Sequence, residues 1–178
     1  MTDVLDGQAN LLGALALIVT DRVGEAMATA GQSTTAAAAL SALYHLLDRP
    51  TLDRLRQVLG LTPSGAVRLV DRLADAGLVR RGPGEDGRSR SVVLTAAGRR
   101  AAARLSAARA AALREPLTEL STVERETLHA LLSRLMAGIV RDKEGGAWIC
   151  RLCDVGACGR AAGRCPAANA AAARFSPT

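Results

Sequence analysis

Apolar side chains recur at helical spacing from the start of the chain. The first such run covers residues 8–28, and Gly31 marks its end. Its apolar positions lie three or four residues apart, which is typical of an amphipathic helix. They are Leu11, Leu12, Leu15, Ile18, Val19 and Val23. We therefore expect a long N-terminal helix with one apolar face.

A second helical segment follows after a short break. Ser33 and Thr34 are residue types that cap helices, and the segment they open extends to about Leu47. Pro50 then prevents continuation, because proline lacks the N–H that the helical hydrogen-bond ladder needs. The sequence predicts a helix between these signals.

Two short helices come next with almost no chain between them. Thr51 can cap the first, and Gly60 can close it. Thr62 and Pro63 open the second at once, with proline at the first helical position, where its missing N–H costs nothing. Two helices joined by so tight a turn form a helix-turn-helix, and residues 62–76 are its second helix.

A β-hairpin is expected directly after this pair. Residues 78–81 and 91–94 are rich in branched apolar residues and indicate two strands, with a turn over residues 82–87. A hairpin in this position is the wing of a winged helix-turn-helix.

Two further helices are predicted beyond the wing. Thr95 can cap a helix that reaches about Arg114 before Pro116 ends it, and Ser121 with Glu124 forms a capping box for the last one. That last helix has an apolar stripe wider than a lone surface helix needs, so a partner helix from a second copy is expected, either the same helix or the N-terminal one. The stripe comprises Leu128, Leu131, Leu132, Leu135, Met136 and Ile139.

The helix over residues 62–76 has one polar face. Ala66, Leu69, Val70 and Leu73 fall on the apolar side, and the opposite side carries Ser64, Gly65, Arg68, Asp71, Arg72 and Asp75. The major groove of DNA admits an α-helix, and arginine can donate two parallel hydrogen bonds to guanine, so Arg68 is the best candidate for base recognition. Near the helix start, free N–H groups favour a phosphate, and Gly65 would allow close approach.

A simpler interpretation of the same face is a solvated surface. Arg68 and Arg72 could merely pair with Asp71 and Asp75 at a spacing of three residues. Val67 could touch a thymine methyl group or be buried against the neighbouring helix.

The distribution of charge favours nucleic acid as the partner. The net charge is +6, and residues 61–100 hold eight arginines against four acids, a net +4. Arg88 and Arg90 flank the wing tip, where they could enter a minor groove or bind phosphates. The aromatic content is only 2%, so the core must consist of aliphatic side chains and alanine, which favours helices packed on helices.

The run LTPSGAVRLVDRLADAGLVRRGPGEDGRSRSVVLTAAGR resembles the recognition helix and wing of MarR-type regulators. The resemblance is close over residues 61–100, and the order of helices fits from about residue 8 to residue 140. It implies an obligate dimer joined by its N- and C-terminal helices, bound to a pseudo-palindromic operator and released by a ligand or an oxidant. It also implies that Asp86 braces Arg88, which enters the minor groove. Gly65 and Val67 depart from the hydroxyl and polar residues that are frequent there.

The sequence thus predicts a mainly α protein, a winged helix-turn-helix with a two-stranded wing and a dimerisation region formed by the N- and C-terminal helices. Residues 1–32 would be the N-terminal dimerisation helix, 33–95 the DNA-binding domain, 96–144 the C-terminal dimerisation helices and 145–178 a cysteine-containing tail, after a linker at Gly145 and Gly146. The candidate DNA contacts are Thr62, Ser64, Gly65, Arg68, Arg72, Asp86, Arg88 and Arg90.

The predicted function is a homodimeric, sequence-specific transcription regulator, a repressor, with a small molecule as a further candidate partner. The alternative is a winged-helix scaffold that binds proteins and has a structural zinc site. An enzyme is not expected, because His45 and His129 are the only histidines and no nucleophile or acid–base pair accompanies them. No apolar run is long enough for a membrane span and the N-terminus lacks a secretory signal, so a cytoplasmic location without a membrane partner is expected.

All four cysteines lie in the tail. Cys150, Cys153, Cys158 and Cys165 follow the pattern C-x2-C-x4-C-x6-C, and Pro166 comes directly after the last. In a reducing compartment this pattern favours metal or redox chemistry over a disulfide framework. Zinc would be the structural choice, whereas an all-cysteine run that ends in Cys-Pro also suits an iron–sulfur cluster. A reversible thiol switch and an unligated tail are the other two interpretations.

Overall fold

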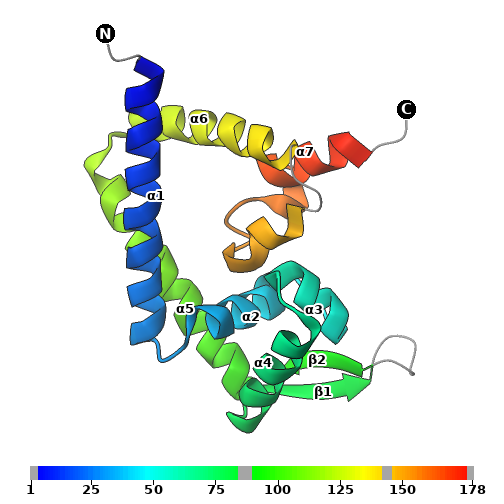
Figure 1. The fold of residues 1–178 in the computed structure, drawn as a ribbon. Coiled ribbons are helices and arrows are strands. Elements are labelled where there is room, and N and C mark those ends of the chain that lie inside the picture. Colours follow the sequence, from blue (N-terminus) through cyan, green and yellow to red (C-terminus); the bar gives the residue numbers. More distant parts are fainter. Residues whose placement is uncertain (1–3, 84–89, 142–145, 176–178) are drawn as a thin grey trace.

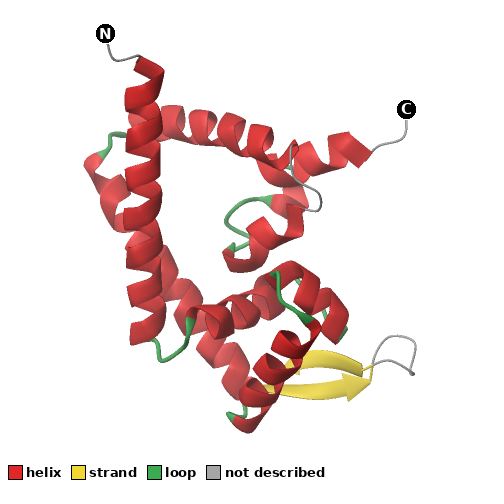
Figure 2. Ribbon diagram, in the orientation of Figure 1, coloured by secondary structure: helices red, strands yellow, loops and turns green. Residues whose placement is uncertain are grey.

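Packed helices and one two-stranded sheet make up the protein (Figures 1 and 2), which is represented by a computed structural model that describes residues 4–83, 90–141 and 146–175. The main elements are α1 (Val4–Thr29), α2 (Thr34–His45), α3 (Leu52–Leu59), α4 (Pro63–Asp75), β1 (Val79–Pro83), β2 (Arg90–Leu94), α5 (Ala96–Arg114), α6 (Thr122–Arg141) and α7 (Pro166–Phe175). Three 3-10 helices are η1 (Glu115–Glu119), η2 (Gly146–Leu152) and η3 (Arg160–Ala162). The predicted mainly α winged helix-turn-helix is confirmed.

The capping signals in the sequence work as predicted. Ser33, Thr51, Thr62 and Thr95 each have extended backbone and accept a hydrogen bond from an amide three residues later. At the start of α6, the Ser121 amide donates to Glu124 Oε2 at 2.8 Å, and the Glu124 amide donates back to Ser121 Oγ at 3.4 Å. These side chains satisfy amide groups that a helix start leaves without a partner, and they fix where each helix begins.

Some boundaries differ from the prediction. α1 begins at Val4 instead of residue 8, because nothing in the preceding residues breaks a helix and Asp6 suits the positive end of the helix dipole. β1 extends to Pro83, so the predicted turn does not begin at Gly82. Gly146 starts η2 instead of lying in a linker.

The wing is anchored to the loop between α2 and α3. β1 and β2 are antiparallel, with Val79 opposite Leu94 and Pro83 opposite Arg90. Thr51 forms an isolated bridge with Ser91, and the Val92 amide donates to the Pro50 carbonyl at 2.9 Å. Pro83 can end the paired edge because its carbonyl accepts from Ser91 Oγ at 2.9 Å. The extra strand residues are therefore stabilised by partners that lie elsewhere in the sequence.

The main core lies around α2. Almost the whole of this helix, from Ala36 to Leu43, is buried, and it packs against α1, α3, α4, α5 and β2. Leu40, Leu55 and Val70 are fully buried there. The winged helix-turn-helix thus has one aliphatic core, as the low aromatic content requires.

The remaining helices extend away from this core. α1 packs along α5, and α6 leads to α7 (Figure 1). α6 packs on α7, while η2 contacts both α2 and α3, so the tail returns from the far end of the molecule to the helix-turn-helix. Within the described part of the chain, no helix is both long and apolar enough to cross a membrane.

Candidate nucleic-acid interface and cysteine cluster

α4 buries the predicted apolar face and exposes the predicted polar one. Its buried residues are Ala66, Leu69, Val70 and Leu73. Ser64, Arg68 and Arg72 are exposed on the other side, and Gly65 is half-buried. Val67 is 40% exposed, so of the two interpretations of this residue the structure favours an accessible side chain. The polar face of α4 is thus open to solvent, while its apolar face is buried in the main core.

Within the part of the chain that the structure describes, the arginines of this face form no local ion pairs. Asp71 instead pairs with Arg81 of β1, with Arg81 Nη2 2.6 Å from Asp71 Oδ1. Among the described residues, neither Arg68 nor Arg72 forms a salt bridge with an acid. The solvated-face interpretation, in which Asp71 and Asp75 neutralise these arginines, therefore does not hold for the static structure.

Thr62 and Gly65 form the start of α4 together. Thr62 Oγ1 accepts from the Gly65 amide at 3.1 Å and lies 3.5 Å from Ser64 Oγ. A Cβ atom at position 65 would lie only 3.0 Å from Thr62 Oγ1. Glycine thus keeps the cap uncrowded, a second reason for this residue beside the close phosphate approach that we predicted.

The wing places further cations beside α4. Arg90 is exposed at the start of β2, and Arg80 and Arg81 are exposed on β1. Arg49 Nη2 donates to the Pro83 carbonyl at 3.0 Å, which ties the wing to the turn before α3. Asp86 and Arg88, the other two predicted wing residues, lie outside the described residues.

A separate apolar surface lies at the opposite end of the molecule. Residues of α1 and α6 have exposed fractions between 44% and 73%, namely Leu11, Leu12, Leu15, Ile18, Leu131, Leu132, Leu135 and Ile139. A groove of about 840 Å³ between the two helices is lined by apolar side chains and by Gln8 and Arg134. Met136, by contrast, packs against the tail, so α7 covers one edge of the stripe that the sequence assigned wholly to a partner.

The four cysteines form one group of two pairs. All four are free thiols, with Cys150 and Cys165 buried and the other two half-buried. The thiols of Cys150 and Cys153 interact with each other, and the thiol of Cys158 interacts with that of Cys165. Cys150 also interacts electrostatically with Cys158 across the pairs. The tail thus brings together every thiol that the sequence singled out.

The two members of the first pair differ in acidity. The hydrogen bond from Cys153 lowers the pKa of Cys150 to about 6, helped by the charge of Arg160, whose Nη1 lies 3.4 Å from Cys150 Sγ, and opposed by burial. The same hydrogen bond, together with burial, raises the pKa of Cys153. Burial raises the pKa of Cys158 as well. One thiolate and one thiol therefore share the first pair at neutral pH.

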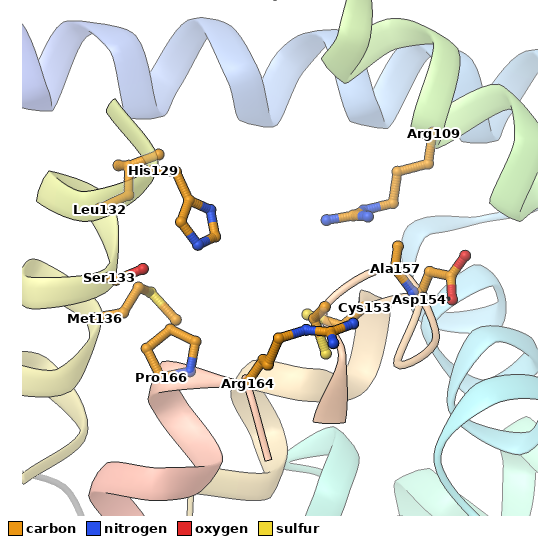
Figure 3. A pocket seen from close by; sticks show the side chains of 11 residues that line it. Arg109, His129, Leu132, Ser133, Met136, Cys153, Asp154, Ala157, Arg164 and Pro166 are labelled. Carbon is orange, nitrogen blue, oxygen red and sulfur yellow. Dashed lines mark hydrogen bonds between the residues drawn. The ribbon is translucent and has the colours of Figure 1, made fainter. Parts of the chain in front are cut away.

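A cavity of about 470 Å³ adjoins the cluster (Figure 3). Cys153 and Cys158 line it, while Arg109 of α5 and Arg164 of the tail project toward it. His129 and Met136 come from α6. The cavity thus lies where α5, α6 and the tail meet, and its lining includes two arginines, Arg109 and Arg164, and one acid, Asp154.

A link between the tail and α2 was not foreseen from the sequence. His45 Nδ1 lies 3.6 Å from Asp154 Oδ1, and His45 Nε2 is 2.9 Å from Ser106 Oγ of α5. The pKa of Asp154 is lowered chiefly by a hydrogen bond from the Ala157 amide, and further by His45, the Gly156 amide and Arg109. Burial acts in the opposite direction and raises it. Asp154 directly follows the C-x2-C motif, so the sequence could have marked it as a candidate functional residue. Nothing in the sequence indicated that His45 is its partner.

The prediction of a metal site stays a prediction. Among the described residues, no group of three or more His, Cys, Asp or Glu side chains is arranged to hold a single ion. The donor set is nevertheless chemically suited to a soft metal, since four thiols lie within one small segment.

Comparison with known sequences supports the assignment of the fold. The sequence model of the MarR family matches residues 30–89, which contain α2, α3, α4 and β1. The winged helix-turn-helix of this chain is therefore similar in sequence to that of the MarR family. No curated protein matches the chain significantly by sequence.

Solved structures extend the similarity in fold beyond those residues. The YusO protein of Bacillus subtilis is 21% identical, with a TM-score of 0.64, and the match covers 76% of this chain and 96% of YusO. RV2887 of Mycobacterium tuberculosis, a MarR family protein in complex with p-aminosalicylic acid, is 25% identical, with a TM-score of 0.56, over 71% of this chain and 96% of RV2887. CouR of Rhodococcus jostii, bound to p-coumaroyl-CoA, is 22% identical, with a TM-score of 0.59, over 76% and 95% of the two chains. Each of the three matches leaves about a quarter of this chain uncovered.

Proposed function

We propose that this chain is a sequence-specific DNA-binding regulator of transcription that acts as a homodimer on a pseudo-palindromic operator. The observation that carries the proposal is the face of α4, where Ser64, Arg68 and Arg72 are exposed above a fully buried apolar side. In a winged helix-turn-helix of the MarR type, that helix is the one suited to enter a major groove. Arg68 reads a base, and Arg72 and Arg90 bind phosphates.

The homodimer is supported by the apolar residues of α1 and α6. Large aliphatic side chains seldom form so extended an exposed surface on a protein that remains monomeric. Two copies of this surface facing each other would bury it around a two-fold axis. An isologous contact of this kind places the two reading heads, which are the winged helix-turn-helix units from α2 to β2 of each chain, in opposite orientation. A palindromic target follows from that symmetry.

Repression and release by a small molecule are the finer parts of the proposal. A dimer bound across an operator occludes it, which is the simplest way in which such a regulator represses transcription. RV2887 and CouR were each solved with a small molecule bound, which supports a ligand-controlled regulator of the same fold.

The test is DNA binding by Arg68→Ala on a duplex selected from random sequence by the wild-type protein. Loss of a bidentate arginine–guanine contact costs about 1–3 kcal/mol, so we expect affinity for the selected duplex to fall roughly 5- to 150-fold. Arg114→Ala is the matched control, since Arg114 ends α5 far from the wing (Figure 1) and should bind like the wild type.

Salt dependence separates DNA binding from a scaffold function. Phosphate contacts release counterions, so affinity should fall steeply as salt rises. If no sequence is enriched by selection and residual binding responds only weakly to salt, the proposal is wrong, and the alternative of a protein-binding scaffold is favoured.

A further inference from the structure

The pairing of the four thiols indicates the kind of centre they suit. A structural zinc ion needs four thiolates that converge on one point as a tetrahedron. Here Cys150 and Cys153 share one turn, in which the Cys153 amide donates to the Cys150 carbonyl at 3.0 Å. Cys158 packs against the small core that contains Cys165. Among the described residues, no group of three or more donors is arranged to hold one ion. In a [2Fe–2S] cluster with four cysteine ligands, each iron takes two thiolates, so two neighbouring pairs match its ligand pattern.

The surroundings of the pairs suit such a cluster in space and charge. The cavity of about 470 Å³ beside Cys153 and Cys158 has room for the inorganic sulfides and irons. Four thiolates with a [2Fe–2S] core bear a net negative charge, and the two arginines that line the cavity, Arg109 and Arg164, outnumber its one acid, Asp154. Arg160 already donates to Cys150 Sγ, the type of hydrogen bond that stabilises a ligating sulfur.

The tail around the cluster connects two parts of the molecule. Leu152, between the first two cysteines, packs against the main core beneath the helix-turn-helix. Cys158 and Cys165 belong to a second small core, together with Val140 of α6 and Ala167 of α7. The first pair is therefore fixed to the reading head and the second to the dimerisation helix.

We propose that Cys150, Cys153, Cys158 and Cys165 bind a [2Fe–2S] cluster that joins the reading head to α6, so that the presence of the cluster controls DNA binding. Its regulatory part rests on the proposed function. The tail has few large apolar residues of its own, so the bonds to iron supply much of what holds it in place. With the cluster bound, α6 and the helix-turn-helix keep a fixed relative position. Without the cluster, α6 and the helix-turn-helix can move relative to each other, and the distance between the two reading heads of a dimer is no longer fixed.

The first test is the metal content of the full-length chain purified without oxygen. We expect a coloured protein with about two iron and two sulfide ions per chain, and a paramagnetic signal after reduction. Cys158→Ser should lose iron and colour, whereas Ala157→Ser, which adds a hydroxyl next to the same site and removes no thiol, should keep both. Near-stoichiometric zinc, four irons per chain, or no metal even after incubation with ferrous iron and sulfide would each overturn the [2Fe–2S] assignment.

The second test is the effect of the cluster on DNA binding. Removing the cluster from the wild-type protein with a chelator should weaken binding to the selected duplex by roughly 5- to 150-fold, the usual range of coupling between two sites. Rebuilding the cluster should restore it, a control that does not depend on the folding of Cys158→Ser. If the cluster is present and its removal leaves affinity unchanged, the regulatory part is wrong while DNA binding by α4 stands. If the cluster is present but no duplex is bound, it is the proposed function that fails.

Discussion

Single residues decide how closely the wing approaches α5. The Thr95 amide donates to the Leu78 carbonyl at 3.0 Å, and Thr95 Oγ1 donates to the Gly77 carbonyl at 2.6 Å. A Cβ atom at Gly98, one turn into α5, would lie 1.9 Å from that Leu78 oxygen. Because backbone atoms on both sides are held by hydrogen bonds, neither can move away cheaply.

Gly98→Ala should therefore destabilise the protein, by about 1–3 kcal/mol or more, as overpacking against a fixed backbone does. Gly24→Ala is the matched control, because Gly24 also lies inside a helix but nothing lies within 4 Å of an added Cβ. It should instead stabilise by about 0.5–1 kcal/mol. Urea unfolding followed by circular dichroism measures both, and equal stability of the two variants would refute this view of Gly98.

The capping box of α6 gives a pH-dependent prediction. Hydrogen bonds from the Ser121 hydroxyl and amide hold the pKa of Glu124 below its ordinary value of 4.5. Since the folded-state pKa is lowered, the cap is intact above that ordinary value and is lost as the pH falls through the lowered one. The titration midpoint of the Glu124 carboxyl, measured by NMR, should lie below 4.5 and rise in Ser121→Ala. A wild-type midpoint at 4.5 or above would show that the box does not form in solution.

At the scale of elements, α1 and α6 present the surface through which two chains are expected to join. Leu135 is 48% exposed and lines the groove between these helices. Leu135→Glu would place a charge in the contact, and burying an unpaired charge is strongly unfavourable. We expect this variant to sediment as a monomer and to bind the selected duplex at least tenfold more weakly. Leu135→Met, which keeps volume and polarity, should remain dimeric. A wild-type protein that is monomeric at micromolar concentration would contradict the proposed dimer.

The elements that the sequence predicted well are those set by local signals. The caps Ser33, Thr51, Thr62 and Thr95 start their helices as expected, because each acts on an amide only three residues away. The end of β1 was missed because Gly82 pairs with Ser91, and Pro83 accepts hydrogen bonds from Ser91 and from Arg49, which lies 34 positions away. The apolar face of α4 was correct residue by residue, since helical periodicity alone determines it.

At the scale of the whole molecule, the position of the tail could not be predicted. The cysteine spacing singled out the four thiols, but their pairing and the contact of Leu152 with the main core depend on how η2 reaches α2 and α3. The link from Asp154 to His45 joins residues more than a hundred positions apart. These contacts make the tail part of the folded body instead of an appendage, which is why its chemistry can affect the reading head.

The most direct measurement of the central claim is a hydroxyl-radical footprint of the full-length protein on its selected duplex. If two copies read DNA through α4 and the wing, protection should appear as two equivalent stretches related by a two-fold axis, about one helical turn of 10 base pairs apart. Arg68→Ala should abolish this pattern at the same protein concentration, while Arg114→Ala should reproduce it. A single protected stretch, or protection that persists in Arg68→Ala, would contradict the account.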